Sequence, residues 1–182
     1  MFQHVSMIAI FAIASLLFTA KDLSAQNFSG LDKSPTDIAT FPKRGTDKTV
    51  KVVYGRPQTK GREVFGNLIT YDKIWRTGAN EATEITFYKD VKINDKVIKA
   101  KTYTIFTIPS ADGKWTFILN SKLNQWGAYQ YEESNDVIRI KIKAKKAVEN
   151  IEAFSITFEK SKSGTIMYLG WENTILEIPI EF

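Results

Sequence analysis

The chain contains no cysteine and a single histidine, His4. Without cysteine it can form neither a disulfide framework nor a lipid-attachment site, so its stability must come from the core alone. His4 lies in an N-terminal segment that we expect to be removed, which leaves a mature protein without histidine. These absences exclude Ser-His-Asp and Cys-His nucleophiles, histidine-based zinc, iron or copper sites, and haem held by histidine or cysteine. Carboxylate, lysine, tyrosine and arginine chemistry remains, as do oxygen-bound cations and binding without catalysis.

The N-terminal apolar run is too short to cross a membrane. It spans Ile8–Phe18, eleven residues, whereas a transmembrane helix needs roughly 20. A run of this length followed by Leu23-Ser24-Ala25 is typical of a signal peptide cleaved after Ala25. We therefore predict a signal peptide at 1–25, a periplasmic or secreted mature protein, and no membrane anchor.

Positive charge is only mildly in excess, with a formal net charge of +5 at pH 7. Removal of 1–25 takes away one lysine and one aspartate, so the excess does not change. The basic run Arg139, Lys141, Lys143, Lys145 and Lys146 alternates with isoleucines, as on the solvent face of a strand. This distribution does not favour nucleic acid as a partner. We expect no cofactor and no metal site, and the oligomeric state stays open.

Apolar residues recur with a period of two along most of the chain, which predicts strands. The expected strand regions are 49–54, 84–89, a hairpin over 91–98, 101–109, 114–120, 137–143, 151–160, 165–171 and 174–182. A long irregular region, 58–80, carries too many apolar residues to be disordered and is expected to be a packed loop. We predict a single all-β domain over 49–182, an antiparallel β-sandwich of the jelly-roll type. A polar lead-in over 26–48 precedes it, and it either begins a single helical turn at Pro35 capped by Ser34 or lies over the domain without one.

The stretch from Ile74 to Phe87 combines an aromatic residue, polar side chains and a turn. Its segment Gly78-Ala79-Asn80 is suited to a turn, and the residues after it alternate as in a strand. Small-molecule sites are concavities in which a few placed polar groups fix the ligand. We therefore predict one pocket built around this stretch. Its candidate ligand-binding residues are Arg56, Arg62, Trp75, Arg76, Asn80, Glu81, Glu84, Trp126 and Tyr129.

Each group of candidates also has a structural interpretation, which the residue types favour. The arginines can clamp an anionic group, or they can pair with Glu63, Glu81 or Glu84 and hold the long loop to the sheet. The aromatic residues can stack on a ligand, but such residues are more often part of the core. We expect Trp126 to be partly exposed, because Gly127 beside it leaves room.

Three classes of function remain open. The favoured one is a non-catalytic binding domain for a small polar ligand, either a saccharide or a carboxylate-bearing molecule. The second is a histidine-free hydrolase that uses Glu81 with Glu84 or Glu172, since glycosidases need two carboxyl groups across the sugar. The third is a structural or protein-interaction module, for which no pocket is expected.

Several sequence blocks together resemble the family known as domain of unknown function 2911, which occurs in secreted bacterial proteins. The blocks follow one another along the whole mature chain: Ser34-Pro35, Tyr54 to Arg62, Trp75 to Thr83, Phe106 to Pro109, Gln125 to Tyr129, and Trp171-Glu172. The resemblance implies export and a single β-rich domain. It implies no activity, so the function must be argued from the residues themselves.

Overall fold

The structure is a computed structural model that describes residues 26–182. The predicted signal peptide at 1–25 lies outside the described residues. Residues 26–31 are exposed and have no regular secondary structure. Asp32–Phe182 forms a compact unit that contains all the strands. Within the described part of the chain, no helix is both long and apolar enough to span a bilayer.

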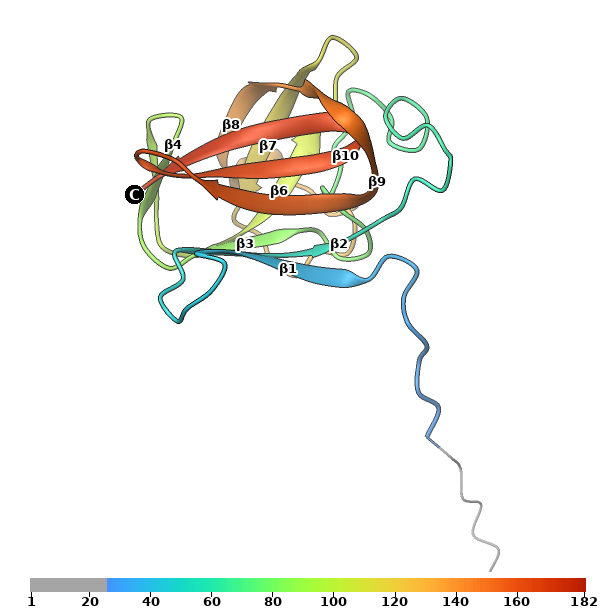
Figure 1. The fold of residues 1–182 in the computed structure, drawn as a ribbon, viewed down its shortest axis with the longest axis horizontal. Coiled ribbons are helices and arrows are strands. Elements are labelled where there is room, and N and C mark those ends of the chain that lie inside the picture. The colour runs from blue at the N-terminus through green and yellow to red at the C-terminus, as the bar shows by residue number, and fades with distance from the viewer. Residues whose placement is uncertain (1–25) are drawn as a thin grey trace, which may run out of the picture. The chain divides into compact units, whose positions relative to one another are not determined.

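Two antiparallel β-sheets form the fold (Figure 1). One sheet has six strands in the order β1-β2-β3-β6-β7-β8, and the other has four in the order β5-β4-β10-β9. The strands are β1 (Thr36–Phe41), β2 (Val50–Gly55), β3 (Glu84–Phe87), β4 (Val91–Ile93), β5 (Lys96–Ile98), β6 (Thr102–Ile108), β7 (Lys114–Asn120), β8 (Asp136–Lys143), β9 (Lys145–Lys160) and β10 (Gly164–Glu181). The predicted all-β sandwich is confirmed.

The period-two pattern has the expected consequence in β2 and in the central strands. Val50, Val52 and Tyr54 of β2 are buried, because alternate residues of a strand face the same side of the sheet. In β6 every residue from Tyr103 to Thr107 is buried, so both faces of this strand are covered, as expected. A second, smaller core cluster covers the outer side of the sheet, where Ala82 packs with Phe106 and Ile118. The loop that carries the candidate site is thereby fixed against β6 and β7.

The region 58–80 is a packed loop, as its apolar content predicts. Phe65 and Trp75 are buried in the main core. The indole of Trp75 stacks on that of Trp171 with ring centroids 5.7 Å apart, and its edge meets Phe154 at 5.3 Å. Such aromatic pairs add to the stabilisation that burial alone provides. The loop is therefore anchored in the core.

The polar segment before Thr49 contributes a strand, not a helical turn after Ser34. β1 pairs antiparallel with β2 from Thr36 opposite Gly55 to Phe41 opposite Val50. The sequence of this segment is polar because β1 is an edge strand. Only its second half packs on the core, through Ala39 and Phe41. The compact unit that contains β1 spans Asp32–Phe182.

The two expected strands nearest the C-terminus form a single strand. The regions 165–171 and 174–182 belong to one long strand, β10, which the irregularities around Glu172 interrupt without ending it. Glu172 has φ of +52°, a left-handed conformation at which the strand is locally distorted. The aromatic segment 124–131 forms a loop beside the outer face of the six-stranded sheet, where Ala128 packs against the second core cluster.

Candidate functional site

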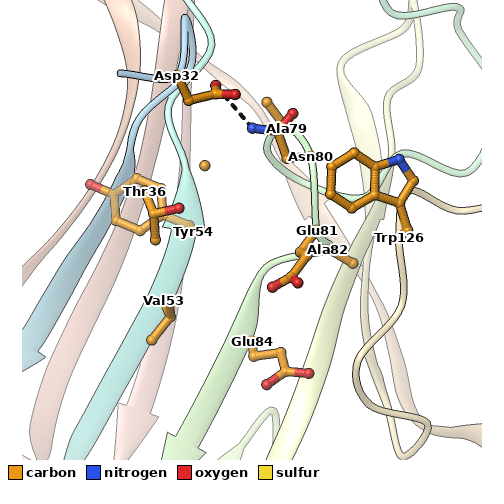
Figure 2. A pocket seen from close by; sticks show the side chains of 11 residues that line it. Asp32, Thr36, Val53, Tyr54, Ala79, Asn80, Glu81, Ala82, Glu84 and Trp126 are labelled. Carbon is orange, nitrogen blue, oxygen red and sulfur yellow. Dashed lines mark hydrogen bonds between the residues drawn. The ribbon is translucent and has the colours of Figure 1, made fainter. Parts of the chain in front are cut away.

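A groove of about 380 Å³ lies where β1, β2 and β3 meet the loops around Asn80 and Trp126. Figure 2 shows Thr36, Val53 and Tyr54 on one side of it and Glu81, Glu84 and Trp126 on the other. The lining consists of Asp32, Thr36, Val53, Tyr54, Gly55, Ala79, Asn80, Glu81, Ala82, Glu84 and Trp126. The strands supply a rigid floor, and the two loops supply polar and aromatic walls.

Buried hydrogen bonds fix the turn that carries Asn80 and Glu81. The indole Nε1 of Trp75 donates to the carbonyl of Gly78 at 3.1 Å, and the Thr83 hydroxyl donates to the carbonyl of Thr77 at 2.6 Å. Thr77 and Asn80 have φ of +54° and +61°. This conformation is uncommon for a β-branched residue such as threonine, and it persists only where the surroundings enforce it. The turn is therefore held in one strained shape, which sets the directions of the Asn80 and Glu81 side chains.

Gly55 lets this turn lie directly on the end of β2. A Cβ atom on Gly55 would come within 2.2 Å of the carbonyl oxygen of Ala79. Gly78 in the turn is equally close to β2, because a Cβ on Gly78 would lie 3.1 Å from the carbonyl oxygen of Gly55. The Tyr54-Gly55-Arg56 and Gly78-Ala79-Asn80 segments are thus in backbone contact, and this contact shapes the groove.

We expect Gly55→Ala to destabilise the fold and to displace the turn. The added methyl group collides with backbone rather than with a flexible side chain, and overpacking of this kind costs about 1–3 kcal/mol. Thermal unfolding measures the loss, and the backbone amide shifts of Asn80 and Glu81 report the displacement. Gly30→Ala is the control, since no atom lies within 4 Å of a Cβ there. Equal melting temperatures for the two variants would contradict the proposed close contact.

Carboxylates dominate the polar lining. Asp32 accepts hydrogen bonds from the Ser34 amide at 2.6 Å and from Asn80 Nδ2 at 3.0 Å. One oxygen of Glu84 accepts from the Asn124 amide at 2.8 Å, and Glu81 is exposed on the groove wall. The lining residues include no lysine and no arginine. The groove therefore presents hydrogen-bond acceptors and negative charge, although the whole chain carries a net charge of +5.

The hydrogen bonds to Asp32 also predict its titration. The Ser34 amide, and after it the Asn80 side chain, lower the pKa of Asp32 below its ordinary value of 3.8, because both favour the ionised carboxylate. The contribution of Asp32 to stability is therefore fully present above pH 3.8 and is lost as the pH falls through its lowered pKa. A carboxyl carbon NMR titration should give a midpoint below 3.8 that rises in Asn80→Ala. A midpoint at or above 3.8 would contradict the hydrogen bonding.

Trp126 stands at the rim of the groove with its indole 63% exposed, in line with the expectation from Gly127. Its backbone is fixed, because residues 125–127 pair with the site turn. Glu81 and Trp126 form a β-bridge, the Ala82 amide donates to the Gln125 carbonyl at 2.8 Å, and the Gly127 amide donates to the Asn80 carbonyl at 3.1 Å. A large exposed aromatic side chain on a rigid backbone is a typical ligand-stacking surface.

Arg56 is one of the predicted residues that the structure places away from the groove. Its guanidinium donates to Asp37 Oδ2 at 2.9 Å, to Ser155 Oγ at 2.8 Å and to the carbonyl of Phe154 at 3.0 Å. It thereby links β1 to β9. Arg56 therefore holds parts of the fold together, as the structural interpretation of the arginines expects. Its partners are not the glutamates that the sequence suggested.

Arg62 and Trp75 also lie outside the groove lining. Arg62 donates to the backbone carbonyls of Thr59 at 2.9 Å and Gln58 at 2.8 Å, so it fastens its own loop. Trp75 belongs to the core and is only 6% exposed. A pocket that unites these residues with Asn80 and Trp126 is therefore not what the structure forms.

Arg76 and Tyr129 lie beside the groove and do not line it. A Cβ on Gly127 would come within 2.8 Å of the Tyr129 ring and within 3.3 Å of Arg76 Nη1. Tyr129 is 85% exposed. Arg76 Nε and Gln125 Oε1 are buried and have no hydrogen-bond partner among the described residues.

Seven groove residues were not among the candidates predicted from the sequence. Five lie on β1, β2 or the segment before them, and the other two flank Asn80 and Glu81: Asp32, Thr36, Val53, Tyr54, Gly55, Ala79 and Ala82. A signal was present for Asp32, because Asp-x-Ser is typical of a turn in which the aspartate accepts from the amide two residues later. For the metal question, the described residues contain no group of three or more histidine, cysteine, aspartate or glutamate side chains placed to hold an ion.

A comparison with protein families finds a match over residues 34–180 to the family described as "Protein of unknown function (DUF2911)". No curated protein and no solved structure matches the chain. The matched range begins just before β1 and ends within β10, so it covers both sheets and nearly all of the groove lining. On this match, the chain belongs to the DUF2911 family.

Proposed function

We propose that this protein is a non-catalytic binding domain that holds a small polar ligand in the groove. The observation that carries the proposal is the exposed indole of Trp126 beside three carboxylates, those of Asp32, Glu81 and Glu84. An aromatic face contributes apolar contact, and a few fixed polar groups orient the ligand. The strained turn and its buried hydrogen bonds keep these groups in place before the ligand arrives, which lowers the ordering cost of binding.

Of the two ligand classes that the sequence left open, the groove favours a saccharide. Sugar hydroxyls donate hydrogen bonds to carboxylates, and the apolar face of a sugar ring can lie on the indole. A carboxylate-bearing ligand would instead meet three carboxylates with no basic residue among those that line the groove. Like charges at such a site disfavour binding.

The predicted signal peptide supports a further part of this proposal, a location in the periplasm or outside the cell. In that compartment the protein would meet glycans from the cell surface or the surroundings. Cell fractionation with an antibody against the folded domain tests the location. Recovery of the unprocessed chain only from the cytoplasm would overturn it.

The competing function is hydrolysis, because Glu81 and Glu84 both line the groove. A non-catalytic domain should release no reducing ends when it is incubated with glycans that bind to it. We expect no release from the wild-type protein or from Glu81→Gln. Release by the wild type that disappears in Glu81→Gln would replace the binding function by a glycosidase.

A further inference from the structure

Two exposed aromatic residues stand on one loop, and only one of them lines the groove. Trp126 is 63% exposed and Tyr129 is 85% exposed. Trp126 forms part of the groove wall, whereas Tyr129 lies beyond it. Exposed aromatic side chains that gather beside a groove mark a binding surface more often than scattered ones do. Tyr129 therefore needs an explanation that the groove itself does not provide.

Gly127 places the Tyr129 ring and the Arg76 guanidinium next to each other. Its φ is +70°, and its missing side chain leaves the space that both groups approach. The ring and Arg76 Nη1 therefore lie on the same side of Gly127. The Gly127 amide donates to the carbonyl of Asn80, and Asn80 lines the groove. The Tyr129 ring and the Arg76 guanidinium are thus next to the groove, and only the backbone around Gly127 separates them from it.

Arg76 differs from the arginines that hold the fold together. Arg56, Arg62 and Arg139 each donate hydrogen bonds to protein oxygens. Arg76 Nε is buried and has no hydrogen-bond partner among the described residues. Gln125 is 3% exposed, and its Oε1 also lacks a partner among the described residues. Buried polar atoms are nearly always paired in native proteins, by water or a ligand if not by the protein.

We propose that Arg76, Gly127 and Tyr129 form a second subsite, so that the ligand is an oligosaccharide of at least two rings. This inference rests on the proposed function. The first ring lies in the groove against Trp126 and donates its hydroxyls to the carboxylates. The next ring lies beyond the groove, where it stacks on the exposed side of the Tyr129 ring and presents its oxygens to the Nη donors of Arg76. The ligand-binding surface is accordingly longer than the groove.

Calorimetric titration with matched short and long sugars tests this subsite. The probes are glucose with maltotetraose, and N-acetylglucosamine with chitotetraose. The second subsite predicts that one tetrasaccharide binds at least about fivefold more tightly than its monosaccharide, the size of one aromatic stacking contact. Tyr129→Ala should remove this preference and leave monosaccharide affinity within about twofold. Tyr129→Phe keeps the ring and should behave like the wild type.

Arg76→Gln provides the second variant, and Tyr88→Ala is the matched control. Tyr88 is 54% exposed and follows β3 at the end away from Glu84. Arg76→Gln should weaken the tetrasaccharide, and Tyr88→Ala should change neither sugar. Equal affinity of short and long sugars, or equal weakening of both by Tyr129→Ala, would overturn the second subsite and leave the groove as the site. Failure of every probe to bind would overturn the proposed function as well.

Discussion

Trp126→Ala is expected to weaken glycan binding by about 2 kcal/mol, roughly thirtyfold in Kd. The indole is the largest exposed apolar surface of the groove, and tryptophan is among the residues whose truncation most often costs this much. Its side chain is 63% exposed, so its removal should leave the melting temperature within about 2 °C. Calorimetric titration and thermal unfolding of the same samples measure both quantities.

Trp126→Phe shows whether the loss of affinity comes from lost stacking on the ligand or from an altered loop conformation. The phenyl ring keeps an apolar face, so this variant should retain part of the affinity that Trp126→Ala loses. Tyr88→Ala removes an exposed ring from the end of β3 away from Glu84 and should bind as the wild type does. If Trp126→Ala binds glycan as tightly as the wild type, the ligand does not rest on this indole.

Trp75→Ala has the opposite expected profile, with a large loss of stability. The indole is 6% exposed and packs on Trp171 and Phe154. Truncation of a buried aromatic residue costs about 3–5 kcal/mol, which lowers the melting temperature of a domain of this size by about 10 °C or more. The variant also loses the hydrogen bond to the Gly78 carbonyl, so the site turn should loosen.

Thermal unfolding of Trp75→Ala beside Trp126→Ala gives the matched comparison. Both variants lose one indole from the list of candidate ligand-binding residues, yet only Trp75→Ala should destabilise the fold. Amide hydrogen exchange at residues 77–81 then shows whether the turn opens. A melting temperature for Trp75→Ala close to that of the wild type would contradict the assignment of Trp75 to the core.

The strands were predictable where local alternation matched burial. Val50, Val52 and Tyr54 show this, since each alternate residue of β2 is buried. β1 was not predictable because an edge strand with one partner buries little side-chain surface. The continuity of β10 was hidden because the left-handed Glu172 looks like an interruption in the residue pattern. The local sequence pattern therefore predicted the central strands of the two sheets better than the edge strand and the limits of the strands.

For the site, the sequence identified residues but not their partners. Asn80, Glu81, Glu84 and Trp126 do line one groove, and the first three are close in sequence. The pairing of Glu81 with Trp126 joins segments 45 residues apart, and no periodicity reveals such a contact. The partners of the arginines were hidden for the same reason. Arg56 bonds to Asp37 and to the backbone of β9, and these segments come close to it only in the folded protein.

Gly55 shows what a short motif can encode. In the sequence it is one residue of a Tyr-Gly-Arg-Pro turn, and nothing local distinguishes it from other turn glycines. In the fold it is the point where the Ala79 carbonyl rests on β2. Two of the blocks that carry the family resemblance, Tyr54 to Arg62 and Trp75 to Thr83, therefore meet in one structural unit, which holds Asn80 and Glu81 at the groove.

An amide NMR titration of the isotope-labelled protein with the glycan panel tests the central claim most directly. The groove account predicts that shifts concentrate on Asn80, Glu81 and Glu84 and on the indole N–H of Trp126, and that they saturate with one Kd. The core indole N–H of Trp171, which is bonded to the Glu152 carbonyl, should not move. Shifts confined to other surfaces, or no shift with any glycan, would contradict a saccharide-binding groove.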